Sequence, residues 1–341
     1  MFASRQLMFA FLIGCSAQGG EPAPVSPTGT DGAASDSLTD TTPEDVGFKA
    51  DAVPMDAPPE VVAKVYANTD TTLWELDPLT KIATKIGPFK GTATGEDMTD
   101  IAVDAAGKVF GVSVLPGDQG HVYALTLPSS GTGDVTATPK RSLPATTRFY
   151  ALAFAPKGVL GAEEALVAGD DAGTVWWIPT DGSAPAKIGD FGNVAAGDPG
   201  GGTAGTQWQL SGDLAFFSNG GMPVGVATIR PCSSAMSCKA DNDVLVEIDM
   251  TALAKKDPKA RLLKRFVGAA SGYGRLFGIG AWNDEVFAFQ RSSASNGAQL
   301  VSVSLVTGKG TIVRDFPEIT TARDGWSGAG VTTSAKITIP K

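Results

Sequence analysis

Histidine, cysteine and long apolar segments are all scarce in this chain of 341 residues. It has one histidine, His121, and three cysteines, so histidine-based catalytic triads and multi-histidine metal centres are not expected. The apolar run LMFAFLI (7–13) is too short to cross the hydrocarbon core of a bilayer as a helix. Basic stripes and aromatic–basic interleaving are also lacking, so we expect no nucleic-acid partner.

The N-terminal residues have the features of an export signal. Arg5 precedes the apolar run and small residues follow it, which is typical of a secretory signal peptide. The run ends in LIGC (12–15), which resembles the lipobox of bacterial lipoproteins. The resemblance implies that residues 1–14 are removed and that Cys15 is acylated, which anchors the chain stably to a membrane. The alternatives are an ordinary signal peptide or a buried N-terminal helix.

The segment after the lipobox differs in composition from the rest of the chain. Ser16 resembles the residue found in outer-membrane-sorted lipoproteins, so we expect an outer-membrane anchor, with the protein facing the periplasm or the cell surface. Residues 15–60 are rich in Pro, Gly, Ser, Thr, Ala and Asp and nearly lack aromatics, which predicts a disordered tether. Most of the net charge of −9 lies in this tether, so the predicted folded domain, residues 61–341, is almost neutral.

The two remaining cysteines, Cys232 and Cys238, lie in the segment RPCSSAMSC (230–238). Two cysteines so close in an exported chain most simply form a disulfide that closes a small loop. A metal site is not expected there, because the chain has no second cysteine pair and only one histidine.

From residue 61 onward, short alternating segments separated by Gly, Asn, Asp and Pro predict an all-β fold. The segment 251–266 has a partly helical pattern that Pro258 interrupts. The strands recur in units of four, and repeats of this length indicate a repeat architecture. Each unit begins with an apolar strand that has a small residue at its centre. These central residues are Ala102, Ala153, Ala215, Gly278 and Gly328.

The phrases LWELDPLTKIATKIGPF (73–89) and DIAVDAAGKVFGVS (100–113) resemble the repeats of bacterial β-propellers of the quinoprotein-like and YncE-like kind. The resemblance covers about residues 61–337, implies a β-propeller and carries over no catalytic residue. Small residues suit the innermost strands, which crowd around a narrow axis. We expect five four-stranded blades, with the C-terminal strand completing the blade that starts at Val61 and leaving no long free edge. Six blades are the alternative, and a β-sandwich is a more distant one.

Candidate site residues lie where the longest loops are expected. In a propeller, the loops that enter first strands share a face with those that join second to third strands, and the longest here is 192–209. Asp100 and Asp213 begin first strands and could act as general acid and base on a glycosidic bond. The alternative is that they accept backbone N–H groups from the neighbouring blade. The candidate ligand-binding residues are Asp100, Tyr150, Trp208, Asp213, Arg275 and Trp326.

These features favour a membrane-anchored lipoprotein whose propeller binds a protein, peptide or glycan on its long-loop face. The alternative is a carbohydrate-active enzyme, a glycoside hydrolase or lyase, that uses Asp100 and Asp213. The sequence favours the binding module and leaves catalysis open. We expect no cofactor and no resident metal. Calcium is left open at the clustered acids of 169–177 and 241–249, which lack the spacing of a known calcium loop.

Overall fold

The computed structural model describes residues 64–339 apart from residues 116, 118, 235–236, 239–241, 292–296 and 320–324. The predicted signal peptide, Cys15 and the predicted tether lie outside the described residues. Within the described part of the chain, no helix has the length and apolar character needed to cross a membrane.

The described chain consists almost entirely of strands, which confirms the all-β prediction. The elements are β1 (Val65–Asn68), β2 (Thr72–Leu76), β3 (Ala83–Lys90), β4 (Asp97–Val103), β5 (Val109–Val114), β6 (His121–Thr126), β7 (Val135–Ser142), β8 (Phe149–Ala155), β9 (Ala165–Asp170), β10 (Thr174–Ile178), β11 (Ala186–Asp190), β12 (Trp208–Asn219), β13 (Met222–Ser234), β14 (Ser237–Cys238), β15 (Val244–Ile248), α1 (Met250–Ala254), β16 (Leu263–Phe266), β17 (Leu276–Trp282), β18 (Glu285–Arg291), β19 (Ala298–Val303), β20 (Gly310–Phe316) and β21 (Gly328–Val331).

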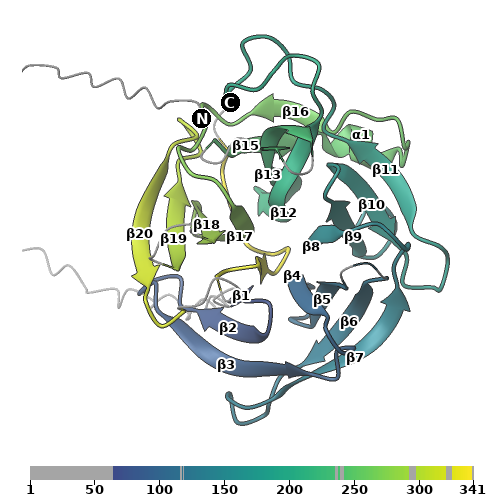
Figure 1. The fold of residues 1–341 in the computed structure, drawn as a ribbon, viewed down its shortest axis with the longest axis vertical. Helices are drawn as coiled ribbons and strands as arrows, with labels where there is room; N and C mark the ends of the chain where they lie inside the picture. The colour runs from purple at the N-terminus through teal and green to yellow at the C-terminus, as the bar shows by residue number, and fades with distance from the viewer. Residues whose placement is uncertain are drawn as a thin grey trace, which may run out of the picture. The chain divides into compact units, whose positions relative to one another are not determined.

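Neighbouring strands in the sequence pair into antiparallel sheets, and these sheets lie around a common centre (Figure 1). One sheet has the order β21-β1-β2-β3-β7-β6-β5-β4, in which β3 and β7 form a short parallel pairing between two antiparallel runs. The others have the orders β11-β10-β9-β8, β12-β13-β15-β16 with β14 on β13, and β17-β18-β19-β20. The arrangement is propeller-like, as the repeat predicted.

The two ends of the described chain meet in one sheet. Strand β21 pairs antiparallel with β1, with Val331 opposite Val65 and Gly328 opposite Asn68. The C-terminal strand therefore occupies the inner position beside β1 and β2 that the sequence analysis assigned to it. This pairing supplies hydrogen-bond partners to backbone groups that would otherwise form a free sheet edge.

The innermost strands β4, β8, β12, β17 and β21 contact one another in a ring, and this crowding explains their small residues. Ala102, Ala153 and Ala215 are buried there. A Cβ at Gly278 would lie 2.5 Å from the backbone N of Ala329, and a Cβ at Gly328 would overlap the carboxyl group of Asp100. Backbone and side chains of adjacent sheets thus approach too closely for a larger residue at these positions.

Tight turns connect the inner strands to their partners. The β12–β13 hairpin turns at Gly220 and Gly221, whose φ angles are 57° and 84°. The β17–β18 hairpin turns at Asn283 and Asp284, with φ angles of 48° and 64°. Two consecutive positive φ angles match the twist of antiparallel strands, and Gly, Asn and Asp tolerate them best.

Apolar side chains fill the spaces between sheets. One aromatic cluster is centred on the fully buried Trp326, whose ring lies 5.4 Å from Phe289, 5.1 Å from Phe316 and 6.0 Å from Trp74, all near perpendicular. Edge-to-face contacts of this kind add to the stabilisation from burial. The cluster joins the sheet of β17–β20 to the sheet that contains β1 and β2.

The partly helical segment has the expected short helix. Asp249 caps α1, and its Oδ1 accepts the backbone N–H groups of Thr251 and Ala252 at 2.9 Å each. The helix ends at Ala254, ahead of Pro258, and the chain returns to the sheet as β16. Proline cannot continue the helical hydrogen-bond pattern, which agrees with this position.

Candidate functional site

A cavity of about 310 Å³ lies where the inner strands begin, and we call it the axial cavity. Its walls come from the starts of first strands and the ends of second strands in every run of four. The lining residues are Asp70, Asp97, Thr99, Val114, Arg148, Tyr150, Asp171, Gln209, Ser211, Arg230, Phe277, Arg291 and Ser327.

Antiparallel pairing explains why residues distant in sequence share this wall. Asp97 at the start of β4 is the register partner of Val114 at the end of β5. Gln209 near the start of β12 is likewise opposite Arg230 in β13. Register partners present their side chains on the same face of a sheet, so each hairpin contributes neighbouring side chains to the rim.

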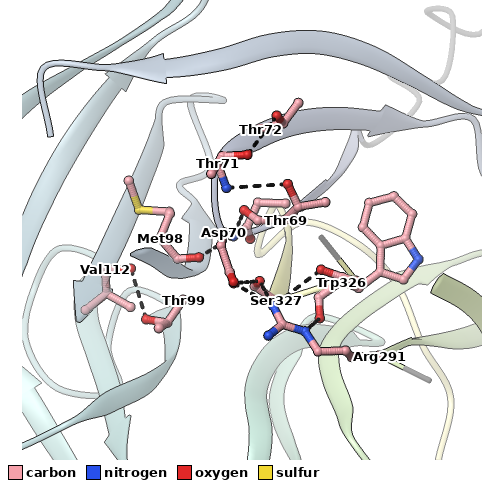
Figure 2. A network of polar contacts seen from close by, with 12 residues as sticks. Thr69, Asp70, Thr71, Thr72, Met98, Thr99, Val112, Arg291, Trp326 and Ser327 are labelled. Atoms are coloured by element: carbon pink, nitrogen blue, oxygen red, sulfur yellow. Dashed lines mark hydrogen bonds and ion pairs between the residues drawn. The ribbon is translucent and has the colours of Figure 1, made fainter. Parts of the chain in front are cut away.

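One side of the axial cavity is held by an arginine clamp, which Figure 2 shows. The Nη2 of Arg291 lies 2.5 Å from Oδ1 of Asp70 and also donates to the hydroxyl of Ser327. The Nε of Arg291 donates to the backbone oxygen of Trp326 at 3.0 Å, and Ser327 donates to Asp70. The clamp joins the end of β18 to the segments that flank β1 and β21, so it fixes the wall where the chain ends meet.

Asp100 and Asp213 lie at the centre of the ring and are fully buried. Asp100 accepts the backbone N–H of Leu152 in β8 at 2.6 Å and that of Ala329 in β21 at 3.0 Å. Asp213 accepts the backbone N–H of Ile279 in β17 at 2.5 Å and its neighbour Leu214 at 2.6 Å. Asp100 therefore ties β4 to β8 and β21, and Asp213 ties β12 to β17, through backbone hydrogen bonds.

The two carboxyl groups lie close enough for the charge of one to affect the pKa of the other. Burial raises the pKa of Asp100 well above its usual range, and the negative charge of Asp213 raises it further. Burial also raises the pKa of Asp213. Two carboxylates in contact cannot both ionise cheaply away from water, so the pair retains a proton that free aspartates would have lost.

A third buried carboxyl group, Asp243, connects the cavity wall to β17. Its Oδ2 accepts the hydroxyl of Ser211 and the backbone N–H of Leu276, the latter at 2.9 Å. Burial raises the pKa of Asp243 to about 6, although these hydrogen bonds favour the charged form. Ser211 lines the axial cavity and Asp243 does not. Asp243 therefore holds the Ser211 side chain in position without forming part of the lining itself.

The structure separates the six predicted ligand-binding residues. Tyr150 lines the axial cavity. Asp100 and Asp213 are not among its lining residues and bond to backbone instead, which is the structural alternative that the sequence left open. Arg275 is exposed and also lies outside the lining.

Trp208 and Trp326 do not reach the cavity either. Both are fully buried. Strand β12 begins at Trp208, where pairing with Pro231 turns the indole into the core against Phe266 at 5.6 Å. Trp326 enters the aromatic cluster between two sheets. Burial of large apolar rings stabilises the fold, which accounts for the position of both tryptophans outside the cavity lining.

Other predicted features lie partly outside the described residues. The backbones of Cys232 and Cys238 are antiparallel register partners, and their disulfide stays a prediction. In 169–177, Asp170 accepts the backbone N–H groups of Ala172 and Thr174 and the indole N–H of Trp176. Among the described residues, no three His, Cys, Asp or Glu side chains cluster in a way that could hold a metal ion.

The sequence analysis missed most of the charged cavity residues. Arg230 and Arg291 occupy the ends of second strands, and Asp171 follows the end of β9. The repeat contained this signal, because the start of a first strand and the end of a second strand are opposite one another in a hairpin. Aligning the second strands as well as the first strands of the repeats would have predicted that these three residues line the axial cavity.

The axial cavity combines charged groups of both signs with hydroxyl and amide groups. Such a wall can orient a polar ligand through several hydrogen bonds. Its partly buried Asp171 has a raised pKa, caused by burial and then by the charge of Asp170. Because Asp100 and Asp213 lie outside the lining, a glycosidic bond in the cavity would not face them.

Neither a family model nor a curated protein sequence matches the chain. Two solved structures that resemble it are a protein of unknown function from Bacteroides caccae and a protein from Lactobacillus plantarum. Each is 10% identical over 79% of this chain, which covers 98% and 99% of their own lengths, with TM-scores of 0.38 and 0.39. Similarity at this level carries no argument about function.

Proposed function

We propose that this protein is an exported lipoprotein whose β-propeller is a ligand-binding module with the axial cavity as its site. Acylated Cys15 anchors it to the outer membrane, and residues 15–60 form the tether to a propeller of residues 61–341. The LIGC (12–15) motif and the polar composition that follows it support the anchor. The ligand is a protein, peptide or glycan that approaches the long-loop face.

We further propose that the propeller has five blades of four strands. The ring of β4, β8, β12, β17 and β21 supports this count, because each of these strands begins a run of four paired strands. In this interpretation, the short β3–β7 pairing is a contact between the outer edges of two blades. Strand β21 then closes the first blade beside β1.

The observation that carries the binding function is the axial cavity itself. Its volume of about 310 Å³ is at the lower end of the range for small-ligand sites. The side chains around it are supplied by rigid strand ends, and the clamp of Asp70, Arg291 and Ser327 holds one wall. A cavity of this size accommodates one or two sugar or amino-acid units, and the rest of a larger ligand would lie on the surrounding loops.

The geometry favours this module over the carbohydrate-active enzyme. A glycosidase needs two carboxyl groups that reach the scissile bond from an open site. Asp100 and Asp213 are fully buried, bond to backbone N–H groups and lie outside the cavity lining.

The anchor is tested by metabolic labelling with a fatty-acid analogue in the bacterial host. We expect the wild-type chain to incorporate the label and to fractionate with membranes, and Cys15→Ala to lose both properties. Cys232→Ala, which removes a cysteine outside the lipobox, is the control and should keep the label. Labelling of Cys15→Ala at the wild-type level would contradict the anchor.

The binding site is tested by a thermal-shift screen of the full chain in mild detergent, with calcium, EDTA, saccharides, peptidoglycan fragments and peptides as the panel. A ligand of the native state raises the melting temperature by mass action. We expect a hit whose shift is lost in Tyr150→Ala, because Tyr150 forms part of the wall. Met222→Ala, at a residue that is 70% exposed, is the control. Hits that persist in Tyr150→Ala would place the site elsewhere.

A further inference from the structure

The axial cavity contains three arginines, and their partners differ. Arg291 binds Asp70 and Ser327 through its Nη2 and the backbone of Trp326 through its Nε. Arg148 and Arg230 form no ion pair with any described carboxylate. Two guanidinium groups at the wall are therefore available for a ligand.

Arg230 has a further feature that points to a ligand. Its Nε is buried, and no acceptor of the described residues lies within hydrogen-bonding distance. A buried donor without an acceptor destabilises the folded protein, so such groups are uncommon. An anionic group in the axial cavity would lie beside Arg230, which is one of the lining residues, and would be attracted by its positive charge.

Tyr150 shows that the positive charges converge on one part of the wall. Burial raises the pKa of the Tyr150 hydroxyl, and the charge of Asp171 adds to the increase. Arg148, Arg230 and Arg291 each oppose it through their positive charge. The guanidinium of Arg148 also lies 5.5 Å from the centre of the Tyr150 ring. The phenol stays protonated near neutral pH and can donate a hydrogen bond to the same anion that the arginines attract.

The acidic residues of the wall limit the charge of that anion. Asp70 is neutralised by Arg291, and Asp171 adds a further acidic group to the lining. A dianion such as phosphate would meet these carboxylates at close range, whereas a single carboxylate would meet them with half the charge. Planar carboxylates also match the fork of donors that a guanidinium presents.

We propose that the axial cavity binds a small molecule through a single carboxylate group, which pairs with Arg148 and Arg230 and accepts a hydrogen bond from Tyr150. This inference rests on the proposed binding function and names the chemistry of the ligand. A uronic-acid unit of a glycan and the C-terminal unit of a peptide both provide such a carboxylate.

Isothermal titration of the full chain in mild detergent tests the inference with matched pairs of probes. The pairs are glucuronate against glucose and N-acetyl-alanyl-alanine against its C-terminal amide, with inorganic phosphate as a separate arm. We expect at least one carboxylate to bind, and its neutral counterpart to bind about tenfold more weakly or worse, since a charge-assisted hydrogen bond is lost. Binding of glucuronate alone identifies a glycan source, and binding of the dipeptide alone identifies a peptide source.

Arginine variants link the binding to this part of the wall. Arg148→Gln and Arg230→Gln should each weaken carboxylate binding by about tenfold or more. Arg148 is exposed, so Arg148→Gln tests the proposal even where Arg230→Gln lowers stability. Arg314→Gln is the matched control, because Arg314 also has a buried Nε without a partner and lies in β20, outside the cavity lining. Its affinity should equal that of wild type.

Three results would overturn the inference. They are tighter binding of phosphate than of either carboxylate, equal binding of an acid and its neutral counterpart, and no binding of any carboxylate. A neutral probe that binds and is lost in Tyr150→Ala would leave the proposed binding function intact while refuting the carboxylate. Loss of ligand response throughout the thermal-shift panel would instead count against the proposed function.

Discussion

Replacing Asp100 with asparagine should change how the stability of the protein depends on pH. Asp100 and Asp213 at the centre of the ring each have a raised pKa, because both are buried. An unfolded aspartate titrates near pH 4, so above that pH the native state binds more protons than the unfolded state. The free energy of unfolding then falls as pH rises, by about 1.4 kcal/mol per pH unit for each retained proton, up to the raised pKa of the pair.

The Asp100→Asn variant lacks the titration of Asp100 and loses one hydrogen bond, whereas the buried Asp213 still titrates. Its single amide oxygen can accept from Leu152 or from Ala329 but not from both in the wild-type geometry. An unsatisfied buried N–H costs about 1–3 kcal/mol. The variant should therefore be less stable than wild type near pH 5, and the difference should shrink by about 1.4 kcal/mol per pH unit as the pH rises.

Urea denaturation followed by tryptophan fluorescence from pH 5 to pH 8 measures this difference. Asp134→Asn, at an exposed residue, is the control and should give a curve parallel to wild type. Asp243, with a pKa of about 6, contributes to the slope of wild type and variant alike and cancels in the comparison. If the difference in unfolding free energy between wild type and Asp100→Asn stays constant or widens as the pH rises, the raised pKa of Asp100 is refuted.

Three further predictions follow from local geometry. Gly278→Ala should destabilise the protein by about 1–3 kcal/mol, because its Cβ would lie 2.5 Å from the backbone of Ala329, whereas Gly161→Ala, with open space around it, should not; urea denaturation compares them. Thiol titration of the denatured protein should detect two more thiols after reduction than before, if Cys232 and Cys238 form the predicted disulfide. Tyr123→Phe should cost about 1–3 kcal/mol in thermal unfolding, because the Tyr123 hydroxyl donates to the buried carboxyl of Glu96; an unchanged melting temperature would contradict this role.

The arrangement of strands was predictable from the sequence because the repeat has a direct physical cause. Small residues are required where inner strands crowd, and Gly278 and Gly328 sit where a Cβ would overlap the next strand. The extent of β12 was less accessible. The strand begins at Trp208 rather than at Asp213, since a register shift between Leu210 and Leu214 lets pairing with β13 continue. A bulge of this kind depends on the partner strand and leaves no period in the sequence.

The candidate site was harder to predict than the fold. Residues at the starts of first strands were considered, whereas five of the thirteen lining residues lie in or just after second strands, Arg230 and Arg291 among them. Tyr150, a candidate from the sequence, lines the cavity because it lies near the start of β8. The inward turn of Trp326 could not be read from its position, since it depends on the partners Phe289, Phe316 and Trp74 from three other strands.

The polar residues near the axis divide into those that hold the fold and those that remain for a ligand. Asp100, Asp213 and Asp243 accept backbone N–H groups from neighbouring strands and so fix the distances between the strand ends. Arg148 and Arg230 form no ion pair with a described carboxylate, and both line the axial cavity near these strand ends. A binding group that is already in place loses little entropy when the ligand arrives, which favours affinity. In the proposed binding mode, the buried acids act indirectly, by fixing the positions of the strands near which the two arginines lie.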